Sequence, residues 1–288
     1  MKYPRISLLE FWQGTVLPEL VYISPSLAMA AASLRNVLVT GTNRGIGFEI
    51  VRQLLTSEPR PDHIFATHRS PLGTESTSAL EKLATEKGQG RIHLVQLDVT
   101  DEASIASAQR TVRSVVGEAG LNVLFNNSAV CVETDRMEQL TAAEMMNHYR
   151  VNSVGPVLMT QALMPLLKQA AELEVNKAEQ FGWKRAAVVH ISSFSGSIGT
   201  KEENWRMYSY KASKAALNML GSLMCEELTD AGVATLLMCP GHVRTDMGGP
   251  AAPLSPEESV AGILEVSSRL DADTNGKFMN LKGQFLEW

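Results

Sequence analysis

Short apolar runs alternate along the chain with segments in which apolar residues recur every three or four positions. The runs are rich in valine, isoleucine, leucine and alanine, and they predict strands near residues 36–40, 63–68, 92–97, 123–126, 186–192, 234–239 and 277–280. Helices are predicted in the gaps between them. This order is typical of an α/β fold, a doubly wound parallel sheet of about seven strands with helices on both faces.

The predicted topology brings the loops after the strands to one edge of the sheet. Right-handed crossovers place the carboxyl ends of parallel strands together, and ligands of such sheets bind at that edge. Six polar or glycine residues follow the predicted strand ends, namely Gly41, Arg69, Asp98, Asn127, Ser193 and Gly241. A binding site at this edge is therefore expected.

A glycine-rich turn follows the first predicted strand and precedes a helical pattern. Its spacing, G-x-x-x-G-x-G from Gly41 to Gly47, departs from the G-x-G-x-x-G pattern, and a plain glycine-rich turn is the alternative interpretation. Glycine lets the backbone approach a pyrophosphate, and a helix N-terminus favours an anion, so we expect a Rossmann-type dinucleotide site. The cofactor-binding residues predicted here are Gly41, Asn43, Arg44, Gly45, Ile46 and Gly47.

Tyr210 and Lys214 are four positions apart in the run Tyr-Ser-Tyr-Lys-Ala-Ser-Lys, which begins at Tyr208. On a helix this spacing places the phenol and the ammonium on one face. A nearby cation stabilises a phenolate, so Lys214 is expected to lower the pKa of Tyr210 and make it an acid catalyst. A solvated helix face is the alternative for the pair alone.

Together these two segments resemble the short-chain dehydrogenase/reductase family, and the resemblance extends from about Leu34 to Trp288. Further motifs stand in the order of that family: residues 97–101 (LDVTD), 126–129 (NNSA), 152–155 (NSVG), 191–196 (ISSFSG) and 240–245 (PGHVRT). The Tyr-x-Tyr-x-x-Ser-Lys run, residues 244–249 (RTDMGG) and residues 283–288 (GQFLEW) are similar to the sniffer and C-factor carbonyl reductases.

The resemblance implies four catalytic residues. Tyr210 protonates the oxygen of a carbonyl that accepts hydride, and Ser193 positions that oxygen, with Ser192 and Ser195 as neighbouring alternatives. Lys214 holds the nicotinamide ribose. Asn152 interrupts its helix and organises water behind Lys214; an ordinary helix-interior Asn is the alternative.

The resemblance also implies further cofactor contacts at Asp98, Val99, Asn127, Val243 and Thr245, and again at Tyr210 and Lys214. Cofactor choice follows from charge. The second strand ends at Arg69 instead of an acid, and Arg44 adds a second cation, so NADP(H) is favoured over NAD(H). Solvated surface charges are the alternative for both arginines.

Composition agrees with one large domain. The chain has 288 residues, 44% of them hydrophobic, and a net charge of −5, which with no dense Lys/Arg patch argues against nucleic acid as a partner. Cys131, Cys225 and Cys239 are too scattered for a disulfide framework, and no Cys/His cluster has metal-ligand spacing. We expect a cytoplasmic protein whose thiols lie in the core or the pocket wall, with no metal.

Two segments depart from the alternating pattern. Residues 1–33 are expected to form a loosely packed N-terminal extension, with residues 34–288 as one Rossmann-type domain; Glu10, Pro18, Glu19 and Pro25 interrupt any signal peptide or membrane span there. Met29 begins a sequence similar to a family N-terminus. Residues 169–184 look like an inserted, solvated surface helix.

The leading hypothesis is an NADPH-dependent carbonyl reductase acting on a small or medium apolar ketone, aldehyde or quinone. The expected partner is that small molecule. The sequence leaves open whether the chain forms a homo-oligomer. Two alternatives remain: a dinucleotide-binding regulatory or signalling protein with vestigial activity, and an isomerase or dehydratase of the same fold. The interval from Ser193 to Tyr210 predicts an enlarged loop, residues 199–206, over a pocket bordered by Val130, Cys131, Phe194, Trp205 and Met247.

Overall fold

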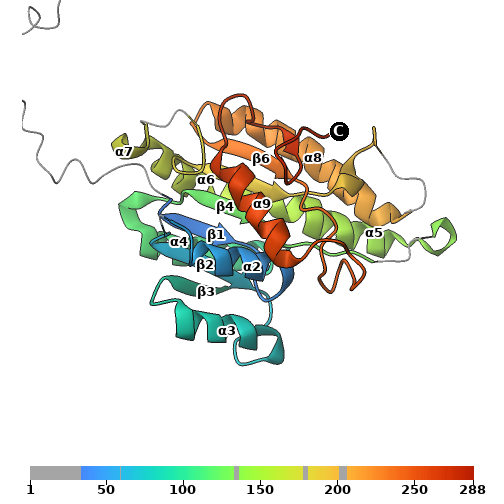
Figure 1. Cartoon of the computed structure of the whole chain (residues 1–288), viewed down its shortest axis with the longest axis horizontal. Coiled ribbons are helices and arrows are strands. Elements are labelled where there is room, and N and C mark those ends of the chain that lie inside the picture. Colours follow the sequence, from blue (N-terminus) through green and yellow to red (C-terminus); the bar gives the residue numbers. More distant parts are fainter. Residues whose placement is uncertain (1–33, 59, 133–135, 178–180, 201–205) are drawn as a thin grey trace, which may run out of the picture. The chain divides into compact units, whose positions relative to one another are not determined.

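A computed structural model describes residues 34–58, 60–132, 136–177, 181–200 and 206–288. The predicted extension, residues 1–33, lies outside the described residues. Seven parallel strands form one sheet in the order β3-β2-β1-β4-β5-β6-β7 (Figure 1). The strands are β1 (Asn36–Val39), β2 (His63–His68), β3 (Ile92–Gln96), β4 (Val123–Asn126), β5 (Ala187–Ile191), β6 (Ala234–Met238) and β7 (Phe278–Met279).

All seven predicted strands are present, and the predicted doubly wound sheet is confirmed. The bounds of β2 and β4 match the predicted ones, and the other strands are shorter by one or two residues. The strand order reverses between β1 and β4, which pair in parallel through Leu38 and Leu124. This reversal is the switch point at which doubly wound sheets bind ligands.

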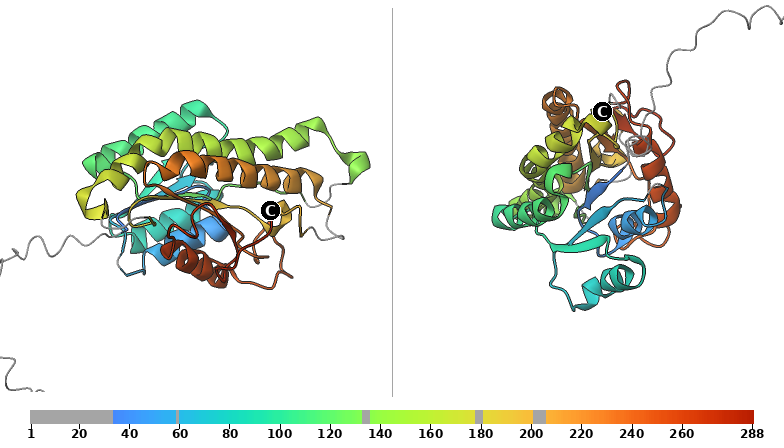
Figure 2. Two further views of the ribbon diagram at one scale, coloured as in Figure 1. Left: turned by 90° about the horizontal axis from the view of Figure 1, so that it is seen from above. Right: turned by 90° about the vertical axis from the view of Figure 1, so that its left-hand side faces the viewer.

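Helices cover both faces of the sheet because the strands from β1 to β6, except β3, are mostly apolar and are buried on both sides (Figure 2). One face packs against α2 (Gly45–Leu54), α3 (Glu75–Lys87) and α9 (Pro256–Ser268). The other packs against α4 (Glu102–Val116), α6 (Gly155–Glu172) and α8 (Tyr208–Thr229). Along β1, Val37 and Val39 point to the first core and Leu38 to the second.

The stretch 169–184 is not the solvated surface helix that the sequence predicted. Helix α6 continues to Glu172, and a short helix, α7 (Glu174–Lys177), follows. Ala170 and Ala171 are fully buried, and Asn176 is buried with its amide donating to the Ala170 carbonyl at 2.7 Å. Apolar contacts on one side of this stretch therefore tie it to the domain, although its polar residues suggested an exposed insertion.

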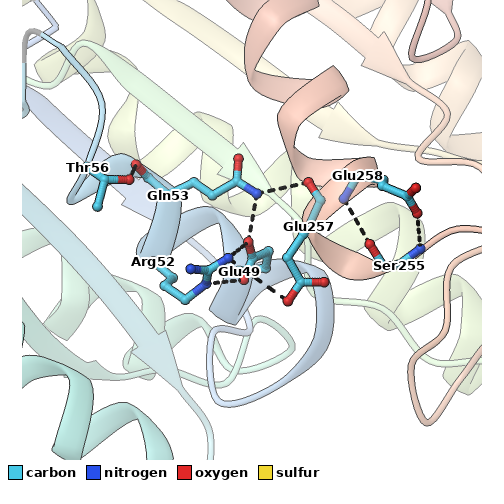
Figure 3. Close-up of polar contacts among 7 residues, drawn as sticks. All are labelled: Glu49, Arg52, Gln53, Thr56, Ser255, Glu257 and Glu258. Carbon is cyan, nitrogen blue, oxygen red and sulfur yellow. Dashed lines mark hydrogen bonds and ion pairs between the residues drawn. The ribbon is translucent and has the colours of Figure 1, made fainter.

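A polar cluster joins α2 to α9 (Figure 3). The side chain of Glu49 in α2 is only 4% exposed, and it accepts hydrogen bonds from Arg52 and Gln53. Gln53 also donates to the Glu257 main-chain carbonyl at 2.9 Å. Helix α9 begins one residue after Ser255, whose hydroxyl accepts from the Glu258 amide in a reciprocal capping box. The cluster fixes the position of α9, and with it the end of the loop that connects β6 to α9.

None of the helices in the described part of the chain is long and apolar enough to cross a membrane. The same part contains no group of three His, Cys, Asp or Glu residues that could hold a metal ion.

Candidate active site

A cavity of about 1280 Å³ opens at the carboxyl ends of the strands. Every site residue predicted from the sequence lines it except Gly47 and Asn152. The predicted residues on its wall are Gly41, Asn43, Arg44, Gly45, Ile46, Arg69, Asp98, Val99, Asn127, Ser193, Tyr210, Lys214, Val243 and Thr245. The structure therefore brings residues from six loops and two helices into one site.

Gly47 lies outside the cavity wall, at a position where only glycine fits. A Cβ atom at this position would stand 2.2 Å from the Gly41 carbonyl oxygen and 2.5 Å from the Asn127 amide nitrogen. Gly41 itself has φ of +69°, which favours glycine, and it packs against the Ser128 side chain. These glycines let the turn close tightly in front of α2. The helix N-terminus, which Arg44 does not cap with its side chain, then faces the cavity.

One hydroxyl holds the switch point together. Thr40 Oγ1 accepts hydrogen bonds from the main-chain amides of Asn127 and Ser128, both at 2.9 Å. The Asn127 side chain returns a hydrogen bond to the Thr40 carbonyl at 2.8 Å and another to Gly41 at 3.1 Å. Asn127 thus fixes the glycine turn against the end of β4 while one side of the residue lines the cavity.

Two arginines lie where a 2′-phosphate is expected. Arg69 is exposed on the cavity wall and has no ion pair with another described residue. Arg44 is paired instead with Asp246, at 3.0 Å, across the cavity from the loop after β6. The sequence did not predict this ion pair, which joins residues 202 positions apart. Both side chains are 73% exposed, so the pair contributes little free energy and leaves Arg44 able to turn toward a phosphate.

Asp98, a predicted cofactor contact, is held by its own loop. Its carboxylate accepts from the Thr100 amide at 2.9 Å and from the Thr100 hydroxyl at 2.8 Å. Burial acts to raise the pKa of Asp98, but the hydrogen bonds from Thr100 and the charges of Arg69 and Arg150 outweigh it and lower the pKa. Asp98 therefore presents a fixed carboxylate to the cavity.

Ser193, Tyr210 and Lys214 meet inside this cavity. Tyr210 and Lys214 lie one turn apart in α8, and Ser193, at the end of β5, is hydrogen-bonded to the Tyr210 side chain. The Ser193 hydroxyl also accepts from the Ser195 amide at 3.1 Å, which fixes its position. Lys214 is 2% exposed, and its ammonium donates to the Ile191 carbonyl at 2.7 Å. Ser192, the alternative serine, bonds instead to Asn218 at 2.6 Å.

The pKa of Tyr210 differs from the prediction. Burial raises it above its ordinary value of 10, the nearby Cys131 thiol adds to the increase, and the hydrogen bond from Ser193 opposes it. Burial also lowers the pKa of Lys214 to about 8, although the Cys131 and Cys239 thiols act in the opposite direction. The expected lowering by Lys214 is not found because both groups are taken out of water. At neutral pH Tyr210 keeps its proton.

The side chain of Asn152 is hydrogen-bonded to the main chain of Val130 and to the hydroxyl of Ser213. It lies in a π-helical turn, Arg150–Val154, between α5 (Ala142–Tyr149) and α6, and its side chain is fully buried. The amide oxygen accepts from the Val130 amide at 2.8 Å, and the amide nitrogen donates to the Val130 carbonyl and to Ser213 Oγ, each at 2.9 Å. Asn152 thereby ties the loop after β4 to α8. π-Helical turns of this kind are frequent at functional sites.

Sequence reasoning found part of the remaining cavity wall. Val130, Cys131, Phe194 and Met247 line it as predicted, and Cys239 is both buried and on the wall. Trp205 lies outside the described residues, as does most of the predicted enlarged loop. Arg206, the last residue of the predicted loop, lines the cavity. The cavity also includes residues that the sequence analysis missed, namely Ser70, Ser76, Met207, Asn280 and Leu286. The motif at 283–288 was the one signal for Leu286.

The family model for short chain dehydrogenases matches residues 35–253. The chain belongs to the short-chain dehydrogenase/reductase family. Members of this family are oxidoreductases that use nicotinamide dinucleotides, which agrees with the glycine turn and the Ser193–Tyr210–Lys214 group.

Solved structures of carbonyl reductases resemble this short-chain dehydrogenase closely. An NADPH-bound carbonyl reductase from chicken fatty liver is 37% identical with a TM-score of 0.82, and the match covers 88% of this chain and 99% of that one. The carbonyl reductase Sniffer of Drosophila melanogaster is 33% identical with a TM-score of 0.84, over 89% and 100%. C-signal of Myxococcus xanthus is 33% identical over 58% of this chain and 93% of its own length. The predicted resemblance to the sniffer and C-factor group is confirmed.

Proposed function

We propose that this short-chain dehydrogenase/reductase is an NADPH-dependent reductase of ketones, aldehydes or quinones. The observation that carries the proposal is the presence of Ser193, Tyr210 and Lys214 in the same cavity as the glycine turn that begins α2. A dinucleotide held by that turn and a carbonyl substrate beside Tyr210 both fit a cavity of about 1280 Å³.

The bound cofactor supplies a hydride to the carbonyl carbon. Tyr210 then transfers one proton to the substrate. Its hydroxyl holds the proton at neutral pH and can donate it to the more basic oxygen that becomes an alkoxide. The Ser193 hydroxyl has one proton, which it donates to Tyr210 in the protein alone; turned toward the substrate, it would donate a second hydrogen bond to the same oxygen while the Ser195 amide holds the serine in place.

Lys214 serves the cofactor. An ammonium has three N–H donors, and the Ile191 carbonyl takes one of them. The other two are suited to the hydroxyls of the nicotinamide ribose, which would bring a fixed cation close to Tyr210. Asn152 keeps α8 in register with the loop after β4 and so acts as a positioning residue.

The preference for NADPH rests on charge. Arg69 stands at the end of β2, where an acid would bind the ribose hydroxyls of NAD and repel a phosphate. A guanidinium offers a planar, permanently charged fork for the 2′-phosphate, and Arg44 can join it by leaving Asp246. The NADPH-bound relative from chicken liver supports the same choice.

The substrate class follows from the wall beyond Tyr210. Val130, Cys131, Phe194, Met207 and Met247 give that region an apolar and sulfur-containing surface. Such a surface favours carbonyl compounds with hydrocarbon or aromatic substituents over sugars or hydroxy acids.

The test is NADPH consumption by the purified full-length chain with a panel of ketones, aldehydes and quinones. We expect turnover with several apolar members of the panel and little or none with polar sugars. NADPH binding in the absence of any turnover over the whole panel would reject the reductase. This result would favour the second candidate, a dinucleotide-binding signalling protein. The 33% sequence identity with C-signal supports that candidate.

A further inference from the structure

The chain reverses direction after β7 and returns to the cavity. Gly283, with φ of +73°, sits in the turn, and Asn280 Oδ1 accepts the amides of Lys282 and Gln284 at 2.9 and 3.1 Å. The returning residues pair with β7 in the antiparallel sense. A bridge joins Met279 and Phe285, and the Leu286 amide donates to the Phe278 carbonyl at 2.8 Å. We refer to residues 283–288 as the return segment.

The side chain of Leu286 faces the cavity from this return segment. It lines the same cavity as Ser193 and Tyr210. It also packs, together with Phe194, on a small apolar cluster formed by Leu237, Cys239 and Phe278. Since Phe194 directly follows Ser193, this packing places Leu286 on the side of the cavity where the carbonyl substrate is expected, away from the glycine turn.

The return segment also braces the loop that follows Ser193. The Gly199 amide donates to the Trp288 carbonyl at 2.9 Å. A Cβ atom at residue 199 would stand 3.3 Å from the Glu287 Cβ and 3.4 Å from the Trp288 carbonyl oxygen, so the two segments lie close together. The Trp288 ring stacks on Phe278, with centroids 5.8 Å apart. These contacts hold Leu286 in place, so its size sets the space beside the substrate.

We propose that Leu286 is a specificity-determining residue that closes the apolar end of the substrate site and selects substrates by the size of their apolar group. The inference rests on the proposed function, because it concerns the substrate of that same site. It assigns a role to a segment that carries none of the catalytic or cofactor-binding residues.

The experiment compares kcat/KM for a series of apolar ketones of increasing size, together with the Kd for NADPH. Leu286→Ala opens the end of the site, so the ratio of kcat/KM between the largest and smallest ketone should rise about tenfold. Leu286→Trp fills the same space and should lower that ratio about tenfold. The Kd for NADPH should stay unchanged in both variants, since Leu286 lies away from the dinucleotide.

Two further variants serve as controls. Leu286→Met nearly conserves volume and should keep the wild-type size profile, which separates a change of shape from a loss of folding. Phe285→Ala alters the neighbouring side chain, which is 63% exposed and does not line the cavity, and should leave the profile unchanged.

The inference is overturned if wild type reduces the ketones but the two size-changing Leu286 variants keep its size profile. It is also overturned if those variants change the NADPH Kd and leave the profile alone. Wild type that reduces no ketone, aldehyde or quinone would instead remove the proposed function itself, and the role of Leu286 with it.

Discussion

The ammonium of Lys214 lies 5.8 Å from the centre of the Tyr210 ring. One turn of α8 separates the two residues, and both side chains reach the cavity. Burial nevertheless moves their pKa values apart, upward for the phenol and downward to about 8 for the amine. Burial thus disfavours the charged form of each group, yet a pKa of about 8 leaves Lys214 mostly an ammonium at neutral pH, and a bound cofactor with its own hydroxyls and charges can change that balance.

Tyr210→Phe should abolish most turnover and keep NADPH binding. The substitution retains the ring and its packing but removes the proton that the carbonyl oxygen needs. General acid catalysis contributes about 10²–10⁴-fold, so kcat should fall by a factor in that range. Stopped-flow turnover with one reactive quinone and NADPH titration of the same sample measure both quantities.

Tyr208→Phe is the matched control for this experiment. Tyr208 is the first residue of α8, its side chain is 38% exposed, and it does not line the cavity. Its kcat should remain within about twofold of wild type, since it holds no reacting atom. A Tyr210→Phe enzyme with the kcat of wild type, where chemistry limits the rate, would show that another group donates the proton.

Arg69→Asp should reverse the cofactor preference. The change places an anion where the 2′-phosphate is expected and supplies an acceptor for ribose hydroxyls. Loss of a charged hydrogen-bonded partner costs about 1.5–3 kcal/mol, so the NADPH Kd should rise at least tenfold while NADH binds more tightly. Fluorescence titration with both cofactors gives the comparison.

Arg110→Asp provides the same change of charge elsewhere. Arg110 is exposed in α4 and lies outside the cavity wall. Its two cofactor affinities should match those of wild type at the same ionic strength. Equal affinities of wild type for NADPH and NADH would contradict the role of Arg69.

His190 should make the fold sensitive to acid. The residue is fully buried in β5, its Nδ1 lies 3.3 Å from the Asn126 amide nitrogen, and its Nε2 has no hydrogen-bond partner among the residues that the structure describes. Burial, with a smaller effect of the Lys214 charge, lowers its pKa from 6.5 to about 3. Between these values the unfolded chain binds a proton that the folded chain does not, so stability falls as the pH decreases below about 6.5.

The contribution of His190 can be isolated with His190→Gln. From pH 7 to pH 5, wild type should lose about 2 kcal/mol of unfolding free energy more than the variant does. Urea unfolding of both proteins at several pH values measures this difference, and all other titrating groups cancel in it. Parallel pH profiles for the two proteins would mean that His190 ionises normally in the folded state.

The cluster in Figure 3 should contribute to stability through its buried carboxylate. Arg52→Met removes the cation beside Glu49, whose side chain is 4% exposed, and should lower the unfolding free energy by about 1–3 kcal/mol. Arg269→Met breaks an ion pair of the same kind with Glu265, but both partners are more than half exposed. That control should cost about 0–0.5 kcal/mol. Equal losses of unfolding free energy in the two variants would show that the burial of Glu49 does not affect the stability of the protein.

The sheet could be predicted because its signal is local. Strands buried on both faces are mostly apolar, as in residues 234–238, where Thr235 is the one polar residue, and a strand of this kind is visible in the sequence without any partner. The stretch 169–184 was misjudged because its polar residues hide a narrow apolar side. Ala170 and Ala171 are too small to reveal in the sequence that they pack against the domain.

Site residues that follow a strand end or belong to a family motif could be predicted from the sequence. Site residues and contacts that depend on the path of a loop or on a chain reversal could not be predicted. Leu286 depends on a chain reversal after β7, and the Arg44–Asp246 ion pair depends on the path of the loop after β6. The pKa of Tyr210 required knowledge of burial, because the four-residue spacing to Lys214 indicates proximity and gives no measure of the loss of water.

The π-helical turn at residues 150–154 has a consequence for sequence evolution. A helix advances about 100° per residue, so deleting one codon on the N-terminal side of Asn152 would turn its amide away from Val130 and Ser213 while the backbone remained helical. Such a deletion could leave a folded protein with a displaced loop after β4. The length of this helix is therefore constrained by the position of one side chain, and insertions or deletions should accumulate in the surrounding loops instead.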